Sequence, residues 1–216
     1  MRLAPEGRRQ IILCTVVLGA AACLVGWWHW AAAIPFLLVW GWSISFFRDP
    51  ERRPVDEVGV LLAPADGRIA DITRLERYDA LSGPAVRVGI FLSLFNVHIN
   101  RAPCRSTVRA VEYRPGKFLA AMNPRAGEAN ESNRVVLETT DPMPGPVVVR
   151  QVAGIAARRI VCHATPGTTY EAGERFGMIK FGSRTELVVP LRENTAILVK
   201  LGDRVRAGLS PIVRQG

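Results

Sequence analysis

Residues 177–190 have the sequence GMIKFGSRTELVVP, in which two apolar runs flank a Gly-Ser pair. Short runs of apolar and β-branched residues that are bounded by turn residues are typical of buried strands. The pattern predicts strands at residues 177–181 and 185–190, with Gly182 and Ser183 in the connection between them. Two strands joined so closely indicate a β-rich domain.

Runs of the same kind continue outward from this segment and are broken by Gly and Pro. They predict further strands at residues 59–63, 67–75, 85–92, 106–113, 134–139, 146–153, 158–162 and 195–200. Residues 116–133 lack clear periodicity, and loops of that length often serve a substrate. We therefore expect residues 59–216 to form a mostly β domain with one long surface loop.

A seven-residue pattern, Gly-x-x-(Tyr/Val)-x-Ala-Gly, occurs at residues 167–173 and again at residues 202–208. Each copy is expected to form a glycine-bounded turn around one inward-facing hydrophobic residue. The second copy resembles the hairpin of biotinyl and lipoyl carrier domains, and this likeness implies a barrel-sandwich-hybrid fold. No lysine stands where a carrier would attach its cofactor, so the likeness concerns geometry alone.

No Asp, Glu, Lys or Arg occurs from Ile11 to Phe47, a run of 37 residues. This run is too long for one core helix or for the apolar part of a signal peptide, so it indicates a membrane segment. The tryptophan-rich residues 27–30 and Pro35 divide it into two shorter spans. Residues 1–47 are therefore expected to form a hydrophobic helical hairpin that anchors the chain in a membrane.

Charged residues flank the hairpin and continue into a proline-containing linker at residues 48–58. The positive-inside rule places loops that are rich in Lys and Arg on the cytoplasmic side of a membrane. The flanking arginines are Arg2, Arg8, Arg9, Arg48, Arg52 and Arg53. They place both ends of the hairpin, and the β domain that follows, on the cytoplasmic face of the cell membrane.

The chain of 216 residues carries 28 Lys and Arg against 19 Asp and Glu, a formal net charge of +9. Nearly all of the basic residues are arginines, which favour planar contacts with phosphate or carboxylate groups. Anionic lipids and phosphorylated substrates are therefore suitable partners, whereas no recognisable module predicts a nucleic-acid partner. The four cysteines lack metal-type spacing, which predicts neither a metal site nor a disulfide.

The Gly182-Ser183 peptide bond joins an unhindered carbonyl group to a residue with a hydroxyl group. If the backbone is strained there and a base is near, the Ser183 oxygen can attack the Gly182 carbonyl and move the acyl group from nitrogen to oxygen. Elimination of the resulting ester breaks the chain, and hydrolysis of the remaining dehydroalanine gives a pyruvoyl group at position 183. An ordinary turn is the alternative interpretation of this Gly-Ser pair.

His98 and Asp66 are the residues that can assist such chemistry. His98 follows a strongly apolar strand and titrates near neutrality, which suits a general acid or base. Alternatively, it is a buried histidine that satisfies a backbone carbonyl. Asp66 lies in a Pro-Ala-Asp-Gly turn, where Asp commonly binds its own backbone. It can instead orient the His98 ring and complete a Ser-His-Asp arrangement with Ser183.

Three segments, residues 64–67 (PADG), 97–103 (VHINRAP) and 174–184 (ERFGMIKFGSR), occur in this order along the chain. Together they resemble the short-form bacterial phosphatidylserine decarboxylases, and the likeness covers nearly the whole chain. Long-form members carry a second histidine three residues before the one that matches His98. Phe95 occupies that place here, so no role of the second histidine is transferred.

The resemblance implies a proenzyme that cuts itself before Ser183 into chains 1–182 and 183–216, which stay together as a heterodimer. It implies catalytic roles for Ser183, His98 and Asp66, and a covalent pyruvoyl cofactor at position 183. The mature enzyme would bind phosphatidylserine in the bilayer of the bacterial inner membrane, form an imine with its amine, release carbon dioxide and yield phosphatidylethanolamine. His98 would return a proton to the substrate.

An apolar pocket would favour loss of carbon dioxide, because a carboxylate is poorly solvated there. We expect Phe91, Phe95 and Phe181 to line this pocket. Arg101 and Arg184 are the expected ligands of the lipid phosphate.

Two other functions fit parts of the pattern. A non-catalytic membrane adaptor would use the hairpin and a barrel-sandwich domain, and it would not need Ser183. A pyruvoyl decarboxylase of a related serine lipid would share the same residues, whereas a bilayer anchor argues against a small soluble substrate. The mass of the isolated protein separates enzyme from adaptor, since only the enzyme requires two chains.

Overall fold

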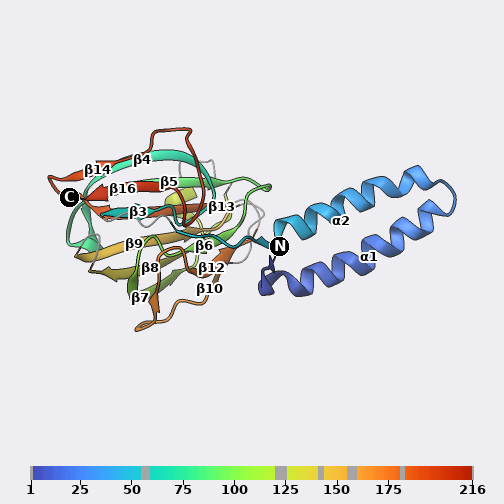
Figure 1. Ribbon diagram of the computed structural model, residues 1–216, viewed down its shortest axis with the longest axis horizontal. Coiled ribbons are helices and arrows are strands. Elements are labelled where there is room, and N and C mark those ends of the chain that lie inside the picture. The colour runs from blue at the N-terminus through green and yellow to red at the C-terminus, as the bar shows by residue number, and fades with distance from the viewer. Residues whose placement is uncertain are drawn as a thin grey trace. The chain divides into compact units, whose positions relative to one another are not determined.

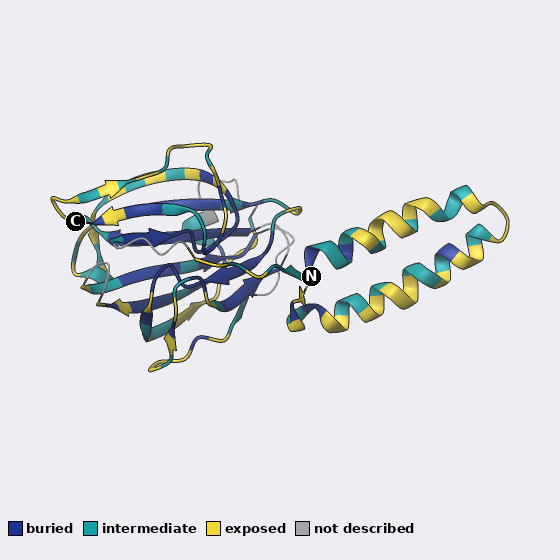
Figure 2. Ribbon diagram, in the orientation of Figure 1, coloured by how far each residue is buried: buried dark blue, intermediate teal, exposed yellow. Residues whose placement is uncertain are grey.

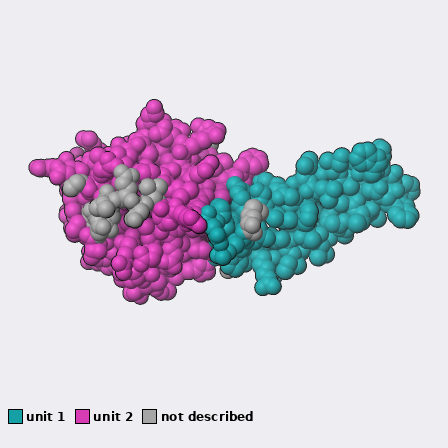
Figure 3. All heavy atoms as spheres, viewed as in Figure 1, with its two compact units in different colours: residues 1–51 teal, residues 52–216 magenta. Residues whose placement is uncertain are grey.

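The computed structural model forms two compact units, Met1–Glu51 and Arg52–Gly216, which Figure 3 shows in different colours. The boundary between them falls inside residues 48–58, the predicted linker. The structure describes residues 2–54, 59–119, 126–140, 144–154, 160–180 and 183–215. Each unit is described by itself below.

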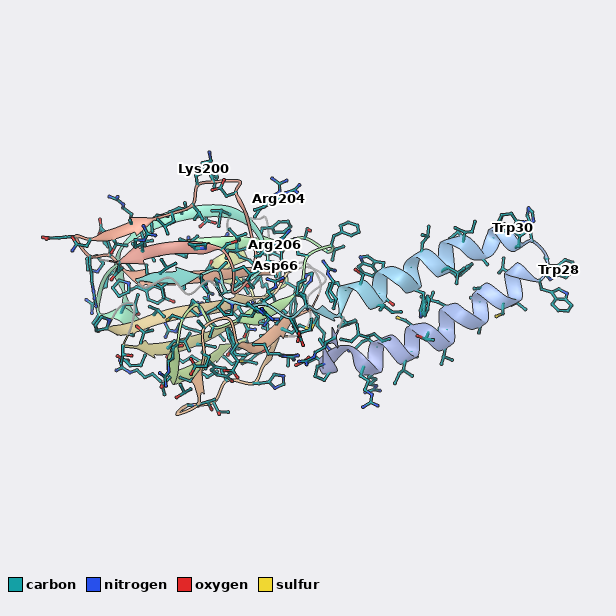
Figure 4. All side chains as sticks on the ribbon, viewed as in Figure 1. Trp28, Trp30, Asp66, Lys200, Arg204 and Arg206 are labelled. Carbon is teal, nitrogen blue, oxygen red and sulfur yellow. The ribbon has the colours of Figure 1, made fainter. Side chains whose placement is uncertain are left out.

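The first unit is a pair of apolar helices, α1 (Arg8–Gly26) and α2 (Ile34–Phe46), as the sequence predicts. The indole Nε1 of Trp40 donates a hydrogen bond to Thr15 Oγ1 across the pair at 2.9 Å. Trp28 and Trp30 lie at the turn between the helices, where their side chains are largely exposed (Figure 4). Short elements complete the unit: β1 (Arg2–Leu3), η1 (Pro5–Gly7), η2 (Trp30–Ala33) and β2 (Arg48–Asp49).

One helix among the described residues, Pro5–Gly26, is long and apolar enough to cross a membrane. The second apolar stretch, Trp30–Phe46, is shorter. Both stretches leave large apolar side chains exposed, among them Leu13, Leu24 and Leu38. The unit therefore offers an apolar surface of the kind that membrane segments present to lipid.

The second unit is mostly β, as predicted, and consists of three sheets (Figure 1). An eight-stranded antiparallel sheet has the order β11-β7-β8-β9-β13-β5-β4-β15, and two three-stranded sheets have the orders β10-β12-β6 and β14-β16-β3. The strand bounds are β3 (Val60–Leu62), β4 (Gly67–Tyr78), β5 (Gly83–Leu92), β6 (Ile99–Arg101), β7 (Ser106–Arg114), β8 (Ser132–Thr139), β9 (Gly145–Val152), β10 (Ile160–Cys162), β11 (Thr169–Tyr170), β12 (Arg175–Ile179), β13 (Ser183–Pro190), β14 (Thr195–Ile197), β15 (Arg204–Val205) and β16 (Pro211–Gln215). Two short helices, η3 (Asp79–Leu81) and α3 (Ala126–Ala129), lie between strands.

Strand β13 lies inside the large sheet, paired with β5 on one side and β9 on the other. Successive residues of a strand point to opposite faces of a sheet. Leu187 and Val189 are fully buried in the main core, so Ser183 and Thr185 belong to the same, core-facing set. Figure 2 shows this strand as almost entirely buried, so the side chain of Ser183 lies inside the fold.

The two copies of the seven-residue pattern adopt the same turn. Their first glycines, Gly167 and Gly202, both have φ of +87°, and their last glycines, Gly173 and Gly208, have φ of +73° and +69°. The copies contain β11 and β15, which are the two edge strands of the eight-stranded sheet. A Cβ atom on Gly208 would lie 3.0 Å from the Cα of Gly173, so the sheet curls until its edges meet at these glycines.

Every strand predicted from the sequence is present, with ends displaced by a few residues. The sequence analysis missed the short strands β6, β11 and β15 and the last strand, β16. In the predicted loop at residues 116–133, the described part contains α3 and an isolated bridge between Lys117 and Asn130. Residues 120–125 of that loop lie outside the described residues.

Candidate active site

Ser183 is the first residue of β13 and lies opposite Leu92, the last residue of β5. Its side chain is fully buried, and its Oγ makes no hydrogen bond with the described part of the chain. A buried hydroxyl group without a partner costs about 1–3 kcal/mol, so its presence calls for a functional explanation. Phe181 and Gly182, which precede it in the predicted cleavage motif, lie outside the described residues.

His98 is held next to the strand that leads into this site. Its carbonyl oxygen accepts a hydrogen bond from the N–H of Ile179, the last residue of β12, at 3.1 Å. The ring is fully buried, and Nδ1 lies 3.0 Å from the carbonyl oxygen of Asn96. A carbonyl can only accept, so this contact assigns the proton of a neutral ring to Nδ1. The other nitrogen, Nε2, is then the one that can take up a proton.

Asp66 is bound on three sides by protein groups. Arg52 donates two hydrogen bonds to its carboxylate, at 2.5 and 2.7 Å, and the Ala207 N–H donates a third at 2.8 Å. The His98 ring is not among the hydrogen-bond partners of Asp66 in the described part of the chain. The direct Asp66-to-His98 bond expected from the sequence is therefore absent in this structure, and Asp66 joins three backbone segments instead. Figure 4 shows Asp66 inside the β unit.

Gly67, which follows Asp66, is required by the close approach of two strands. A Cβ atom at this position would lie 2.1 Å from the carbonyl oxygen of Phe91 on β5. No side chain fits at that distance, so the Asp-Gly pair of the motif is explained by backbone packing at the start of β4.

A chain of buried side-chain hydrogen bonds begins two residues after Ser183. Asn100 Nδ2 donates to Thr185 Oγ1 at 2.9 Å, Gln151 Nε2 donates to Asn100 Oδ1 at 2.9 Å, and Asn133 Nδ2 donates to Gln151 Oε1 at 3.1 Å. All four residues are nearly or completely buried. This chain joins β13, β6, β9 and β8, and it fixes the position of β6 against β13. The sequence analysis did not identify these amides, because isolated Asn and Gln carry no pattern.

Arg184 points to the opposite face of the sheet and is enclosed by carboxylates. Its Nε donates to Glu186 Oε1 at 2.8 Å, and it forms a close ion pair with Asp71 on β4. Gly89 lies beneath the guanidinium, where a Cβ atom would come within 2.1 Å of Arg184 Nη2. Arg150 pairs with the other oxygen of Glu186 at 3.3 Å. These contacts hold the start of β13 in place.

The two carboxylates control the charge of Arg184. Burial by itself would lower the pKa of Arg184, but the hydrogen bond that Arg184 donates to Asp71 and the charges of Glu186 and Asp71 outweigh it and raise the pKa. Burial likewise would raise the pKa of Asp71, and the adjacent Arg184 reverses this effect so that the pKa is lowered. Arg184 and Asp71 are therefore both charged at neutral pH.

The other residues predicted to contact substrate occupy different settings. Phe91 is half-buried on β5. Arg101 is buried and donates to the carbonyl oxygen of Gly173 at 2.9 Å. Phe95 is 75% exposed, in the turn between β5 and β6. In this structure Phe95 does not line a closed apolar wall, and the guanidinium groups of Arg101 and Arg184 are engaged by the protein.

The geometry supports one type of chemistry. Ser183 supplies a buried hydroxyl at a strand end, and His98 supplies a buried imidazole beside the preceding strand. Among the residues that the structure describes, no group of three or more His, Cys, Asp and Glu is arranged to hold a metal ion. The orphaned oxygen of Ser183 fits a residue whose side chain is consumed in forming a carbonyl prosthetic group.

Comparison with known proteins gives a consistent assignment. The family model described as phosphatidylserine decarboxylase matches residues 41–213. A phosphatidylserine decarboxylase proenzyme of Rhodopirellula baltica is 43% identical over 208 residues, covering 96% of this chain and 86% of the relative. The proenzyme of Symbiobacterium thermophilum is 43% identical over 202 residues, covering 91% of this chain and 90% of the relative. The proenzyme of Gluconacetobacter diazotrophicus is 44% identical over 180 residues, covering 82% and 78%. The chain belongs to the phosphatidylserine decarboxylase family.

Proposed function

We propose that this protein is a self-cleaving decarboxylase that converts phosphatidylserine to phosphatidylethanolamine and carbon dioxide. The observation that carries the proposal is the buried, unpartnered hydroxyl of Ser183 at the start of β13, in a chain whose relatives are named proenzymes. Within the described part of the chain, the hydroxyl has no hydrogen-bond partner that would offset its cost. A role as the nucleophile of backbone cleavage explains it.

Maturation would proceed in three steps: an acyl shift, an elimination and a hydrolysis. The Ser183 oxygen attacks the Gly182 carbonyl carbon, the C–N bond breaks, and the nitrogen takes a proton, which gives an ester. A base removes the α-proton of residue 183, and the bond between its Cβ atom and the ester oxygen breaks. This elimination leaves a carboxylate on Gly182 and dehydroalanine at position 183. Water then replaces the nitrogen as ammonia is released. The products are chains 1–182 and 183–216, the second of which begins with a pyruvoyl group.

We assign the role of base in these steps to His98. Its Nδ1–H is held by the Asn96 carbonyl, so a neutral ring presents Nε2 as the proton acceptor. Asp66 contributes indirectly, because its bonds to Arg52 and Ala207 fix the turn that precedes β4. We assign it a positioning role in the precursor.

A pyruvoyl group supplies an electrophilic carbonyl that captures an amine and accepts electrons as carbon dioxide leaves. The residues around position 183 then have three tasks. The apolar side chain of Leu92, which lies opposite Ser183, excludes water from the carboxylate. The β13 ladder holds the reactive end in register with β5. His98 returns a proton to the former α-carbon.

The proposed site of action is the cytoplasmic face of the bacterial inner membrane. The apolar helix Pro5–Gly26 supports membrane attachment. Arginines at both ends of the helical pair support a cytoplasmic location for the β unit. Attachment suits a diacyl lipid substrate, because both partners are then confined to two dimensions.

The test combines intact mass with an assay on phosphatidylserine vesicles. The wild-type protein is expected to give two chains, with the short chain blocked by a hydrazine-reactive carbonyl at residue 183, and to release carbon dioxide. Ser183→Ala should give one uncut chain without activity. An active protein that remains a single uncut chain would overturn the proposal, and an uncut, inactive wild type would favour the adaptor.

A further inference from the structure

The turn between β5 and β6 carries two apolar side chains outward. Its ends are tied by the Asn96 side chain, whose Oδ1 accepts from the N–H and the Oγ of Ser93 at 2.8 and 2.7 Å. A backbone bond from Asn96 N–H to the Ser93 carbonyl closes the turn at 3.0 Å. Leu94 and Phe95, at its apex, are 40% and 75% exposed. We call these two residues the apolar tip.

The apolar tip belongs to an uncharged part of the β unit. No Asp, Glu, Lys or Arg occurs from Val88 to Asn100. Phe95 is also the most exposed large apolar side chain among the described residues of this unit. A rigid, uncharged turn that holds an aromatic ring in solvent is typical of a surface that contacts an apolar phase.

Exposed cations lie on the neighbouring strands. Arg68 on β4 is opposite Phe91 of β5 in the ladder, and Arg204 on β15 is opposite Arg68. Arg206 and Lys200 flank β15 and are exposed as well, and Figure 4 shows these two side chains and Arg204 on the segment around that strand. We call Arg68, Lys200, Arg204 and Arg206 the basic edge.

The basic edge carries four cations, and residues 200–206 contain one carboxylate, that of Asp203. None of its four residues forms an ion pair with the described part of the chain. Asp203, the acidic residue in this turn, uses its carboxylate to accept a bond from the backbone N–H of Lys200 at 2.9 Å. Like charges directly opposite each other on adjacent strands are destabilising, so the Arg68–Arg204 pair indicates an anionic partner.

We propose that the apolar tip and the basic edge together form a surface of the β unit that contacts an anionic bilayer during catalysis. The inference rests on the proposed function, because it explains how a buried site reaches a lipid headgroup. The tip joins β5, whose last residue faces Ser183, to His98, so both catalytic residues are within a few residues of it. The tip enters the headgroup region, and the basic edge binds the anionic lipids around it.

The experiment compares two forms of the same substrate with the full-length, cleaved protein. One form is phosphatidylserine in vesicles, and the other is a short-chain phosphatidylserine below its critical micelle concentration. Phe95→Ser should lower kcat/KM on vesicles by about tenfold, from the loss of one inserted aromatic ring. Turnover of the monomeric lipid should change less than about twofold, since no bilayer is needed. Phe95→Trp should retain vesicle activity.

A second comparison tests the basic edge. The double variant Arg68→Gln and Arg204→Gln should have a kcat/KM on vesicles about fivefold below that of the wild type. At high salt, which screens the charges, the two proteins should have the same kcat/KM. Arg74→Gln with Arg77→Gln is the matched control, since both arginines are exposed at the far end of the same strand, β4. Tyr113→Ser controls for Phe95→Ser, because Tyr113 is 62% exposed on β7, with three strands between β7 and β5.

The outcomes separate the alternatives. Equal losses on both substrate forms would show that Phe95 lines the pocket and would overturn the proposal. A change of oligomeric state in Phe95→Ser would assign the tip to a second copy and would also overturn it. Hydrogen exchange at residues 93–96 gives a readout that needs no catalysis. Slower exchange on phosphatidylglycerol vesicles than on neutral vesicles would support the contact even if the wild type released no carbon dioxide, which would refute only the proposed function.

Discussion

Arg52 and Asp66 form a two-point ion pair inside the β unit. Arg52 Nη1 and Nη2 lie 2.5 and 2.7 Å from the two carboxylate oxygens of Asp66, and both side chains are shielded from water. Arg52 Nη1 also donates to the Ala207 carbonyl at 2.6 Å, while the Ala207 N–H donates to Asp66. One carboxylate and one guanidinium therefore connect the first residue of the unit, the Asp-Gly turn and the second copy of the repeated turn.

Arg52→Ala should lower the free energy of unfolding by about 3–5 kcal/mol, because it leaves a buried carboxylate without its cation. Urea unfolding of the detergent-solubilised protein measures this change. Arg53→Ala, at the adjacent exposed position, should change stability by less than about 0.5 kcal/mol. Equal stability of the two variants would show that the ion pair is dispensable.

His98→Gln should slow self-cleavage by about 100-fold or more, since a glutamine side chain cannot accept the proton. The measurement is the fraction of cut chain over time, read by intact mass after synthesis of the precursor. His163→Gln should mature at the normal rate, because His163 is exposed and lies outside the three motifs. Normal cleavage in His98→Gln would assign the base to another group.

The Asp71–Arg184 pair predicts a specific acid sensitivity. The pKa of Asp71 is lowered in the folded protein. The Asp71 carboxylate therefore takes up a proton less readily in the folded protein than in the unfolded chain. The stabilisation is therefore complete above the ordinary carboxyl pKa of about 3.9 and is lost as the pH falls through the lower pKa of the folded state.

Asp71→Asn should remove this part of the pH dependence. Its free energy of unfolding should lie below that of the wild type at neutral pH, and the difference should narrow in acid. Urea titrations at a series of pH values test this expectation, and a constant difference across the series would contradict it.

Thr185→Val should destabilise the protein by about 1–3 kcal/mol, because Asn100 Nδ2 loses its buried acceptor while the side-chain shape is kept. Thr107→Val is a matched control, since the Thr107 hydroxyl contacts Thr169 at an exposed position. Thermal unfolding of both variants gives the comparison. The buried amide chain would have no energetic role if the two melting temperatures were equal.

Gly208→Ala should destabilise the protein by about 2 kcal/mol or more, because it combines a left-handed backbone with a crowded Cβ site. Gly202→Ala separates these effects, since it has a positive φ but open space, and about 1 kcal/mol is expected. Gly83→Ala has open space and no positive φ, and its stability should stay close to that of the wild type. A different ranking in urea unfolding would contradict the account of the joined sheet edges.

The sequence predicts the longer strands because each of them is long enough to show a pattern of buried, apolar residues. β13 and β9 each contain a short apolar run, at residues 187–189 and 147–149, and such runs can be recognised without knowledge of the neighbouring strands. The short strands β11 and β15 have only two residues each, too few for any period, and they are strands only because β7 and β4 lie beside them. The repeated glycine pattern nevertheless predicts both of their turns.

The predictions about the candidate site also separate into those that rest on local sequence and those that depend on the tertiary fold. The prediction that the Gly182-Ser183 bond is the cleavage site rests on local chemistry, so it needs the sequence alone. One of the two carboxylates that bind Arg184 belongs to Asp71, on a strand distant in sequence, and no local pattern relates these two residues. Phe95 is an apolar residue of the type that lines pockets, but the turn between Ser93 and Asn96 directs its side chain outward. Side-chain type is encoded locally, whereas direction depends on the tertiary fold.

The position of Ser183 at the beginning of an interior strand has a consequence for the life of the protein. A cut there leaves the ladder pairs of residues 184–190 in place, and β13, β15 and β16 remain paired with strands from the preceding part. The fragments can separate only if the whole β unit unravels, and reassembly would then be bimolecular. Such a protein has to fold as a continuous polypeptide before it is cut. Unfolding by heat or denaturant should therefore be reversible for the uncut precursor and irreversible for the cut protein.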